Sequence, residues 1–376
     1  MSSSLKKAWR EAATLIIAAK SSSPIKSTSA FDYRILCMKR SEKTSFLSNN
    51  ISYPGGALEE QDQNINWFEQ FAKFGVSKQD LDTLTLDYHK QKQGNAFIFQ
   101  DKNENIGKKL PKSVSLRIGV IRETFEELGV LLCRQKTSNC KFNQRLNSNY
   151  MRGIDIISYQ KQVHDRKITF LEMCDQLNII PDVFSLFEWS AWLTPTFFSA
   201  RRFETAFFLC TLNDQPPVYP EQNEAFSYFW RSPLEYIQML RQDVVWYHPP
   251  QLYEFTRLAN LTKIEEVLKF ASKREVSGSI LYMPVLYKCT DGMVFTLPGD
   301  DVYPPDPKYV EDDPEARLRT FGGTMEGFRK MSSILNRIEM KSPSEVELHS
   351  NCETISGHLR PKITLNESVD QLRPKL

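Results

Sequence analysis

Residues 118–130 have the pattern of a short helix with one apolar face and one acidic face. Successive side chains turn by about 100° around a helix, so large apolar residues recur here in one narrow stripe. They are Ile118, Ile121, Phe125 and Leu128. The opposite face carries Glu123, Glu126 and Glu127, and Gly129 supplies the left-handed residue that commonly ends a helix. The pattern predicts an amphipathic helix at about Val114–Leu128 that must bury its apolar face against other elements.

An acidic helix face by itself is usually just exposed to solvent. Here a glycine turn, Pro54-Gly55-Gly56, precedes it in the sequence. Hard divalent cations bind carboxylate oxygens, and Mg²⁺ usually keeps waters and substrate phosphates as its other ligands. The turn and the acidic helix together therefore indicate a Mg²⁺ or Mn²⁺ site. The two glycines either let the backbone approach the metal, with a main-chain carbonyl as a further ligand, or form a plain tight turn.

These two pieces resemble the two halves of the Nudix box, G-x5-E-x7-R-E-U-x-E-E-x-G-U, in which U is apolar. The matching positions are Gly56, Asp62, Arg122, Glu123, Glu126, Glu127, Gly129 and Val130. Two positions depart from the motif, because Asp62 replaces a glutamate and Thr124 occupies an apolar place. The larger departure is an insertion, since Arg122 stands about 52 residues further along the chain than in a continuous box.

The split box is itself similar to that of one branch of the Nudix hydrolases, the peroxisomal acyl-coenzyme A diphosphatases of the nucleoside diphosphate-linked moiety X motif 19 type. Four further stretches resemble the same branch. They are Phe187–Thr196, Arg201–Leu209, Trp246–Tyr253 and Leu297–Asp301. The resemblance covers about residues 8–305. It implies an α/β fold, the Nudix α/β/α sandwich with a mixed sheet, a helical insertion over residues 63–113 and extra C-terminal helices.

Composition is compatible with this family but would not identify it. The chain has 376 residues, 41% of them hydrophobic, which is enough for one large core or two modest ones. Its net charge of +2 gives no nucleic-acid or membrane-surface footprint. Seven cysteines without a C-x-x-C pair favour a reducing compartment over a disulfide framework. No apolar run reaches the roughly 18 residues of a membrane-spanning helix.

The hydrophobic pattern predicts where the remaining elements lie. The expected strands are Ala12–Ala19, Tyr33–Lys39, Phe187–Leu193, Glu204–Leu212 and Glu224–Trp230. The expected helices are Ile65–Phe74, Lys78–Gln91, most of Ile154–Asn178, Pro233–Arg241, Pro250–Asn260 and Ile264–Lys273. Residues 283–297 have the pattern of a hairpin that turns at Asp291-Gly292. Residues 306–376 are charged and lack a periodic apolar pattern, so we expect a loosely packed tail there.

Residues three and four apart on a helix share a face, so Glu123 and Glu127 can bind one ion together. Glu126 can bind a neighbouring ion or act through a water. The resemblance implies that these three glutamates are the metal ligands and that Glu126, Glu127 and Arg122 belong to the catalytic group. Arg122 has two interpretations: it contacts substrate phosphate or, as the family pattern implies, it orients the site by pairing with a box glutamate. Asp62 is expected to support the loop.

In many Nudix enzymes the general base is a glutamate outside the central box, which makes Glu224 a candidate here, although it could equally be an ordinary surface glutamate. Arg201 and Arg202 precede an expected strand, and they either contact substrate phosphate or form an exposed basic pair. The five histidines show no H-x3-H spacing, so no zinc site is expected. No recognisable coenzyme A motif precedes the box, and the substrate assignment therefore depends on the split box.

The chain ends in Pro374-Lys375-Leu376, which approaches the S-K-L tripeptide that the peroxisomal import receptor binds. Proline departs from that consensus, whereas the lysine and the leucine fit it. Together with the family resemblance, the tripeptide predicts a peroxisomal protein. The serine-rich, basic start, Met1–Arg10, is mildly like a mitochondrial presequence, which leaves the mitochondrion and the cytoplasm as alternatives.

The resemblance implies metal-dependent hydrolysis of the pyrophosphate bond of coenzyme A and acyl-coenzyme A. The products would be adenosine 3′,5′-bisphosphate and (acyl-)4′-phosphopantetheine. One alternative is a Nudix pyrophosphatase for another nucleotide, such as a dinucleotide or a nucleotide sugar. The other is a Nudix-fold module that binds nucleotides without catalysis. An intact set of three box glutamates argues against such a module, because clustered carboxylates repel one another when no cation is present.

Overall fold

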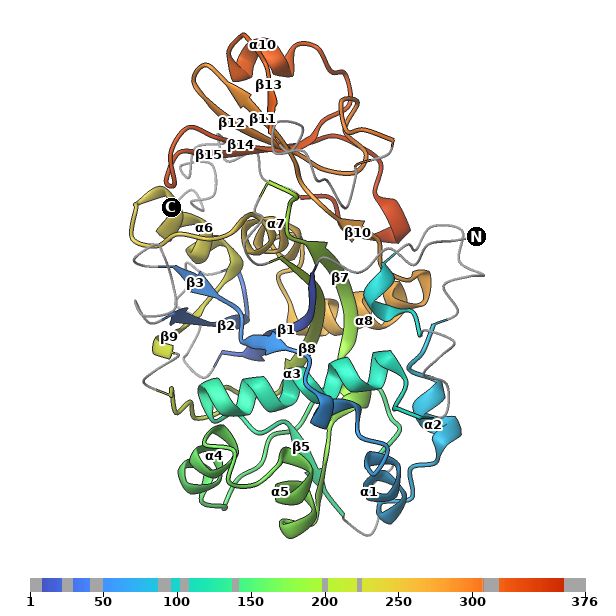
Figure 1. Ribbon diagram of the computed structural model, residues 1–376. Helices are drawn as coiled ribbons and strands as arrows, with labels where there is room; N and C mark the ends of the chain where they lie inside the picture. Colours follow the sequence, from blue (N-terminus) through green and yellow to red (C-terminus); the bar gives the residue numbers. More distant parts are fainter. Residues whose placement is uncertain are drawn as a thin grey trace, which may run out of the picture.

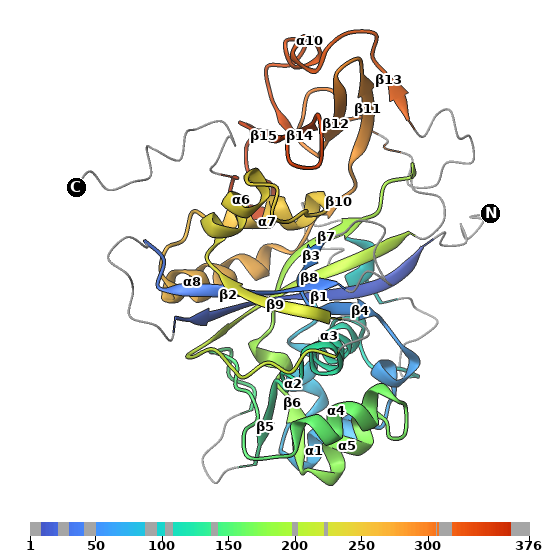
Figure 2. The same cartoon turned by 90° about the vertical axis from the view of Figure 1, so that its left-hand side faces the viewer.

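The computed structural model describes residues 9–21, 30–40, 50–86, 96–101, 108–136, 142–197, 202–221, 225–305, 307 and 318–361. Figure 1 shows a layer of helices at the bottom, a mixed sheet with further helices above it, and a second sheet at the top. The side view in Figure 2 shows that helices cover both faces of the central sheet. This is the α/β/α sandwich expected from the sequence.

The central sheet has eight strands in the order β10-β7-β8-β1-β2-β3, with β4 paired to β1 and β9 paired to β2. Their bounds are β1 Arg10–Lys20, β2 Tyr33–Arg40, β3 Ile51–Ser52, β4 Gly55–Ala57, β7 Phe187–Leu193, β8 Phe203–Leu212, β9 Ala225–Arg231 and β10 Leu281–Tyr282. Strand β1 lies in the middle, parallel to β8 and antiparallel to β2 and β4. Both faces of β1 are buried, which explains why its sequence is a nearly continuous apolar run and not an alternating one.

Helix α3 (Lys112–Leu128) packs across one face of this sheet, against β1 and β4. The same layer contains α1 Trp67–Lys73, α2 Lys78–Asp82, α4 Ile156–His164, α5 Phe170–Gln176, and the two-stranded sheet of β5 Cys133–Gln135 and β6 Ile179–Pro181. Helices α1 and α2 belong to the insertion that splits the box. Their apolar side chains Trp67, Phe71 and Leu81 join α3 and the sheet in one hydrophobic cluster. The insertion therefore extends the core of the domain.

Helices α6 (Pro233–Arg241), α7 (Pro249–Leu258) and α8 (Ile264–Arg274) cover the other face around a second hydrophobic cluster. At its centre, the buried carboxylate of Glu254 accepts hydrogen bonds from Trp189 Nε1 (2.7 Å) and Ser190 Oγ (2.8 Å). Arg257 neutralises this carboxylate at 3.1 Å. Trp189 and Ser190 lie in one of the stretches that resemble the family branch. That stretch therefore has a packing role, since it joins β7 to α7.

Residues 318–361 are folded, and the expectation of a loosely packed tail was wrong for them. Strands β11 Val285–Cys289, β12 Gly292–Thr296, β13 Arg319–Thr320, β14 Asn336–Met340 and β15 Val346–Ser350 form a second sheet in the order β13-β11-β12-β14-β15, flanked by α10 Met325–Arg329. Charged side chains at buried positions, such as Arg337 and Glu339 in β14, hid these strands from the hydrophobic pattern. Asp300 balances Arg337, because its carboxylate accepts hydrogen bonds from the guanidinium at 2.6 and 2.7 Å.

Most other expected elements are confirmed. Strand β7 and helix α6 have the bounds expected from the sequence, and β11 and β12 form the expected hairpin. The helix expected over residues 78–91 is shorter, because α2 ends at Asp82 and residues 87–95 lie outside the described part. The region 154–178 divides into α4 and α5 around Arg166, whose φ of 58° cannot continue a helix. Among the described residues, no helix has both the length and the apolar character needed to cross a membrane.

The last described segment crosses back from the second sheet to the central one. His358 Nε2 donates to the carbonyl of Trp189 (3.1 Å), and Arg257 Nε donates to the carbonyl of Leu359 (3.2 Å). The N–H of Leu359 donates to Nδ1 of His358 (2.7 Å), so the ring is the neutral tautomer with its hydrogen on Nε2. These contacts attach the C-terminal segment to β7 and α7.

Stability should depend on pH through His358. Burial, reinforced by the charges of Arg257 and Arg274, lowers the pKa of His358 well below its ordinary value of 6.5. Below about pH 6.5, His358 therefore binds a proton in the unfolded chain but stays neutral in the folded protein. Its contribution to the free energy of unfolding is complete above that pH and falls by about 1.4 kcal/mol for each pH unit below it. Urea denaturation between about pH 5 and 7 should show a smaller loss of unfolding free energy in His358→Gln than in the unchanged protein. Equal losses in the two proteins would contradict this assignment.

Candidate active site

Helix α3 leaves only one narrow edge at the surface. The apolar stripe expected from the sequence, Ile118, Ile121, Phe125 and Leu128, is completely buried. Only Lys112, Glu123 and Glu126 of the helix keep intermediate exposure. Gly129 ends the helix with a φ of 66°, as the sequence predicted. The acidic residues therefore lie at the one edge of α3 that a ligand can reach.

Strand β4 holds the glycine turn against this edge. Its antiparallel pairing with β1 aligns Gly56 with Ala13. Gly55 has a φ of +146°, and a Cβ there would lie 2.3 Å from the Ala13 carbonyl oxygen. A Cβ on Gly56 would lie 2.4 Å from the Glu123 carboxylate. Close approach to the backbone of β1 thus requires glycine at position 55, whereas a side chain at position 56 would displace the Glu123 carboxylate. The N–H of Gly55 donates to Oε2 of Glu127 (2.8 Å).

Arg122 joins the two halves of the split motif. Its Nε and Nη2 donate to the two oxygens of Asp62 at 2.8 and 2.9 Å. Its Nη1 lies 2.9 Å from Oε1 of Glu123 and donates to Oε1 of Glu126, also at 2.9 Å. The side chain is buried, with its donors directed at protein carboxylates. These contacts agree with a role in orienting the site more than with contact to substrate phosphate.

Asp62 fills the position of the motif glutamate although its side chain is one methylene shorter. It is buried, lies in the 3-10 helix Glu60–Gln63, and accepts the N–H of Glu59 (2.8 Å). Gly119 of α3 faces it, and a Cβ there would lie 3.0 Å from Oδ2 of Asp62. The absence of a side chain at Gly119 lets the 3-10 helix approach α3 closely enough for the aspartate to reach Arg122.

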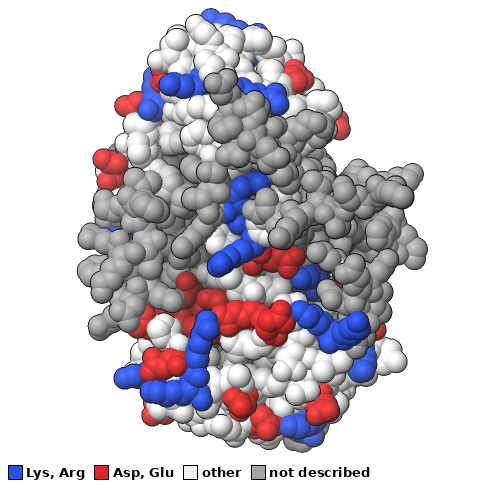
Figure 3. Space-filling view, viewed as in Figure 1, with Lys and Arg blue, Asp and Glu red and all other residues white. Residues whose placement is uncertain are grey.

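The site is rich in negative charge, because four carboxylates lie on or beside α3 and three of them contact the guanidinium of Arg122. The four carboxylates are those of Asp62, Glu123, Glu126 and Glu127. Burial raises the pKa of Glu123 to about 7, against the opposing effect of Arg122. Burial likewise raises the pKa of Glu126. Figure 3 shows acidic side chains gathered in a band across this face, over α3. Clustered carboxylate oxygens held on rigid elements fit a hard divalent cation such as Mg²⁺ or Mn²⁺.

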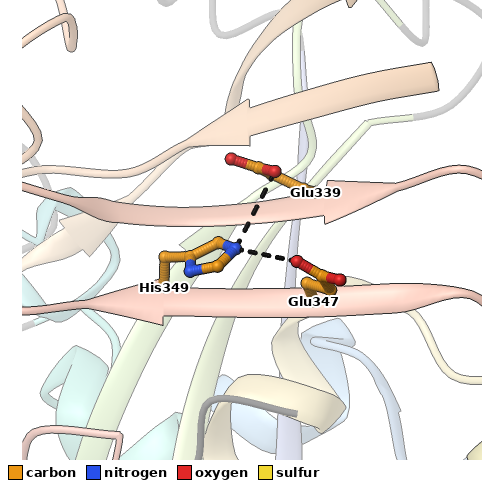
Figure 4. A group of neighbouring side chains, drawn as sticks. All are labelled: Glu339, Glu347 and His349. Atoms are coloured by element: carbon orange, nitrogen blue, oxygen red, sulfur yellow. Dashed lines mark hydrogen bonds and ion pairs between the residues drawn. The ribbon is translucent and has the colours of Figure 1, made fainter. Parts of the chain in front are cut away.

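A second group of side chains that could bind a metal ion lies in the C-terminal sheet. The spacing of the histidines in the sequence did not predict it. Glu339, Glu347 and His349 place ligand atoms within 4.8 Å of one another, and Figure 4 shows them converging from β14 and β15. Arg329 donates to both glutamates, so its guanidinium balances one of their two charges. This group has two carboxylates beside one guanidinium, whereas the group at α3 has four carboxylates beside one guanidinium. The C-terminal group is therefore the weaker candidate for a cation.

The remaining site predictions fare differently. Arg202 is buried, its Nε donates to the Thr194 carbonyl (2.9 Å), and its guanidinium lies over the Trp9 ring at 5.3 Å. Burial of Arg202 contradicts the expectation of an exposed basic pair, whereas a phosphate contact stays a prediction. Arg201 and Glu224 lie outside the described residues, as does the tripeptide at 374–376.

Sequence reasoning missed the segment 219–221, which precedes β9. The N–H groups of Tyr219 and Glu221 donate to the carbonyls of Leu128 (2.8 Å) and Glu127 (2.9 Å) at the end of α3. The Glu221 carboxylate also lies 3.8 Å from Nε2 of His164 in α4. Because these contacts join residues far apart in the chain, no local pattern could have indicated them.

A glycine loop and an arginine-headed acidic helix, brought together across an insertion, have the geometry of a split Nudix box. Family models agree: the NUDT19 Nudix domain matches residues 9–258, and the NUDT19 C-terminal domain matches residues 286–351, which hold most of the second sheet. The chain belongs to the Nudix hydrolase family, in its NUDT19 branch, as the sequence predicted.

Two curated relatives illustrate the similarity. Acyl-coenzyme A diphosphatase NUDT19 of Xenopus laevis is 36% identical over 317 residues, which are 80% of this chain and 82% of the relative. The Homo sapiens protein of the same name is 32% identical over 378 residues, covering 96% of this chain and 98% of the relative. Among solved structures, a NUDIX hydrolase from Alicyclobacillus acidocaldarius aligns with a TM-score of 0.48 and 16% identity, over 69% of this chain and 96% of its own. That similarity is too low to add to the family assignment.

Replacing Gly56 with alanine should weaken metal binding. The new Cβ would displace the Glu123 carboxylate, so we expect the dissociation constant for Mn²⁺ to rise by about tenfold, equivalent to about 1.4 kcal/mol. Electron paramagnetic resonance titration of the free protein measures it. Gly322→Ala is the matched control, because a Cβ at Gly322 meets nothing within 4 Å. Equal Mn²⁺ affinities in the two variants would rule out this role for Gly56.

Proposed function

We propose that this protein hydrolyses the pyrophosphate bond of coenzyme A and acyl-coenzyme A with a bound Mg²⁺ or Mn²⁺. The products are adenosine 3′,5′-bisphosphate and (acyl-)4′-phosphopantetheine. The proposal depends above all on the contact of the glycine loop with the acidic helix, where the N–H of Gly55 lies 2.8 Å from Oε2 of Glu127. Relatives named acyl-coenzyme A diphosphatase, which align with most of the chain, support the choice of substrate.

The chemistry follows from the charge of the substrate. A pyrophosphate diester is anionic and repels an attacking hydroxide, so the site has to neutralise charge and position a water. A bound Mg²⁺ or Mn²⁺ withdraws charge from the phosphoryl oxygens and lowers the pKa of a water that it coordinates. Glu123 and Glu127, one helical turn apart, would hold the ion, with Glu126 beside them.

Other protein groups determine where these carboxylates point. The Gly55 N–H binds Glu127, while Arg122 binds both Glu123 and Glu126. Asp62 in turn fixes Arg122 through two hydrogen bonds. Because these carboxylates are already held in place, binding of the ion costs less conformational entropy. This favours both its affinity and the correct geometry of the site.

Glu224 remains our candidate for the general base. It lies outside the described residues, but its described neighbours support the choice. The N–H of Glu221 donates to the Glu127 carbonyl (2.9 Å), and the N–H of Ala225 donates to the Glu221 carbonyl (2.8 Å). Glu221 is thus attached to the last turn of the helix that carries the box glutamates, and Ala225 is attached to Glu221.

Coenzyme A hydrolysis tests the proposed function directly. With Mg²⁺ or Mn²⁺, the purified protein should release adenosine 3′,5′-bisphosphate, detected by chromatography, and a chelator should abolish the release. Glu127→Gln should lower kcat by about a hundredfold, because a ligand of the ion is lost. Glu347→Gln is the matched control: it makes the same substitution in the carboxylate group of the C-terminal sheet, where Glu347 accepts from Arg329, and should leave kcat unchanged.

The outcomes separate the alternatives. A loss of activity in Glu347→Gln equal to that in Glu127→Gln would contradict the placement of the ion at the box. If the unchanged protein releases no product from coenzyme A, the proposed substrate is wrong. A panel of dinucleotides and nucleotide sugars then distinguishes a pyrophosphatase for another nucleotide from a module that only binds.

We also propose a peroxisomal location, on the basis of Pro374-Lys375-Leu376. A fluorescent protein fused ahead of residue 1 should then coincide with a peroxisomal marker in cells, because the tripeptide stays accessible to the import receptor. Removing the three residues should disperse the fusion protein. Unchanged peroxisomal fluorescence after the removal would contradict the role of the tripeptide.

A further inference from the structure

The last turn of α3 contains two of the box glutamates, and it is also where the backbone carbonyls lack partners within the helix. A helix ends with four carbonyl groups that have no partner within the helix. In α3 these belong to Phe125, Glu126, Glu127 and Leu128. The N–H of Gly129 donates to the first of them (2.8 Å). The other three need donors from outside the helix, and two of the three belong to glutamates of the box.

The connection between β8 and β9 supplies two of these donors. The N–H of Tyr219 donates to the Leu128 carbonyl (2.8 Å), and the N–H of Glu221 donates to the Glu127 carbonyl (2.9 Å). Tyr219 also packs over the helix end, since a Cβ on Gly129 would lie 3.0 Å from its side chain. Residues 219–221 therefore follow the end of α3 closely.

Gln160 of α4 supplies the third donor. Its side chain is buried, and its Nε2 donates both to the Glu126 carbonyl (3.0 Å) and to the Tyr219 carbonyl (2.9 Å). We call these two hydrogen bonds the Gln160 bridge. Since Tyr219 is itself bonded to Leu128, the bridge closes a ring that includes α3, α4 and the segment 219–221. One amide group thus holds the helix end and the segment in a single arrangement.

We propose that Gln160 is a positioning residue for the hydrolysis, because it fixes the last turn of α3 and with it Glu126 and Glu127. The inference rests on the proposed metal-dependent function. Loss of the bridge would remove a partly buried donor from the carbonyls of Glu126 and Tyr219, so the turn would shift or admit water in its place. A shift of about 1 Å at catalytic groups can lower a rate by about a hundredfold. Gln160 itself would touch neither the ion nor the substrate.

The alternative is that Gln160 merely satisfies buried carbonyls, as other glutamines do. Gln70 of α1 offers the comparison within the same chain. It is also buried, and its Nε2 donates to the carbonyl of Ile179 (3.0 Å), where it joins the insertion to β6. Both glutamines tie a helix to a neighbouring backbone, but only Gln160 does so at the turn with the box glutamates.

The test compares Gln160→Met with Gln70→Met in the full chain, since methionine keeps most of the side-chain volume and removes the amide. Three quantities are measured: the Tm, the Mn²⁺ dissociation constant by electron paramagnetic resonance, and kcat and KM for coenzyme A at saturating Mn²⁺. Both variants should lose Tm. Only Gln160→Met should bind Mn²⁺ more weakly and lose kcat by about tenfold or more, with KM within about twofold.

Every outcome bears on the proposal. Unchanged kcat and Mn²⁺ affinity in Gln160→Met would overturn it, and so would equal losses in Gln70→Met. If Gln160→Met does not fold, Gln160→Asn takes its place, because the shorter amide cannot span both carbonyls, with Gln70→Asn as its control. If the unchanged protein does not hydrolyse coenzyme A, the proposed function is wrong. The Mn²⁺ dissociation constants of Gln160→Met and Gln70→Met still test the positioning role of Gln160, and equal constants would overturn it.

Discussion

The ion pair between Arg122 and Asp62 holds together a site whose halves stand 60 positions apart in the chain. Both side chains are buried, so removing Arg122 would leave the carboxylate of Asp62 as an uncompensated charge in the interior, at a cost of about 3–5 kcal/mol. The same guanidinium contacts Glu123 and Glu126, which means that the acidic edge of α3 takes its shape from this pair. The insertion can lie between the halves because its helices pack into the core beside α3 and return the chain to the site.

The likeness to the family outside the box is explained by packing more than by chemistry. Trp189 and Ser190 bind the buried Glu254, which joins β7 to α7. The stretch 297–301 forms a turn in which Asp300 balances Arg337 of β14, while Oδ2 of the adjacent aspartate accepts two backbone N–H groups at 2.8 Å. These residues fix the C-terminal sheet and the helices above the central sheet. A buried polar group needs hydrogen-bond partners at defined positions, so both the group and its partners have to be particular residue types.

What could be predicted from the sequence was local and periodic. The helix that ends at Gly129 and the strands of the central sheet follow from apolar spacing, and the proposed metal site follows from the box. The second sheet could not be predicted in the same way, because Arg337 and Glu339 occupy buried positions in β14 and interrupt the apolar pattern. The role of Gln160 could not be predicted for another reason. Its partners lie 34 and 59 positions away in the chain, and the sequence around a single glutamine in an amphipathic helix does not indicate what it binds.

The insertion also changes when the site can form. In a continuous motif the glycine loop and the acidic helix are near neighbours, so their contact closes a short loop of chain. Here the contact of Gly55 with Glu127 closes a loop of 72 positions, and the end of α3 also binds the segment 219–221. The hydrogen bonds that order the site are therefore complete only after residues 219–221 have been synthesised. An ion that binds only the finished arrangement stabilises it by mass action, and here it would stabilise the insertion, the sheet and the helix end together.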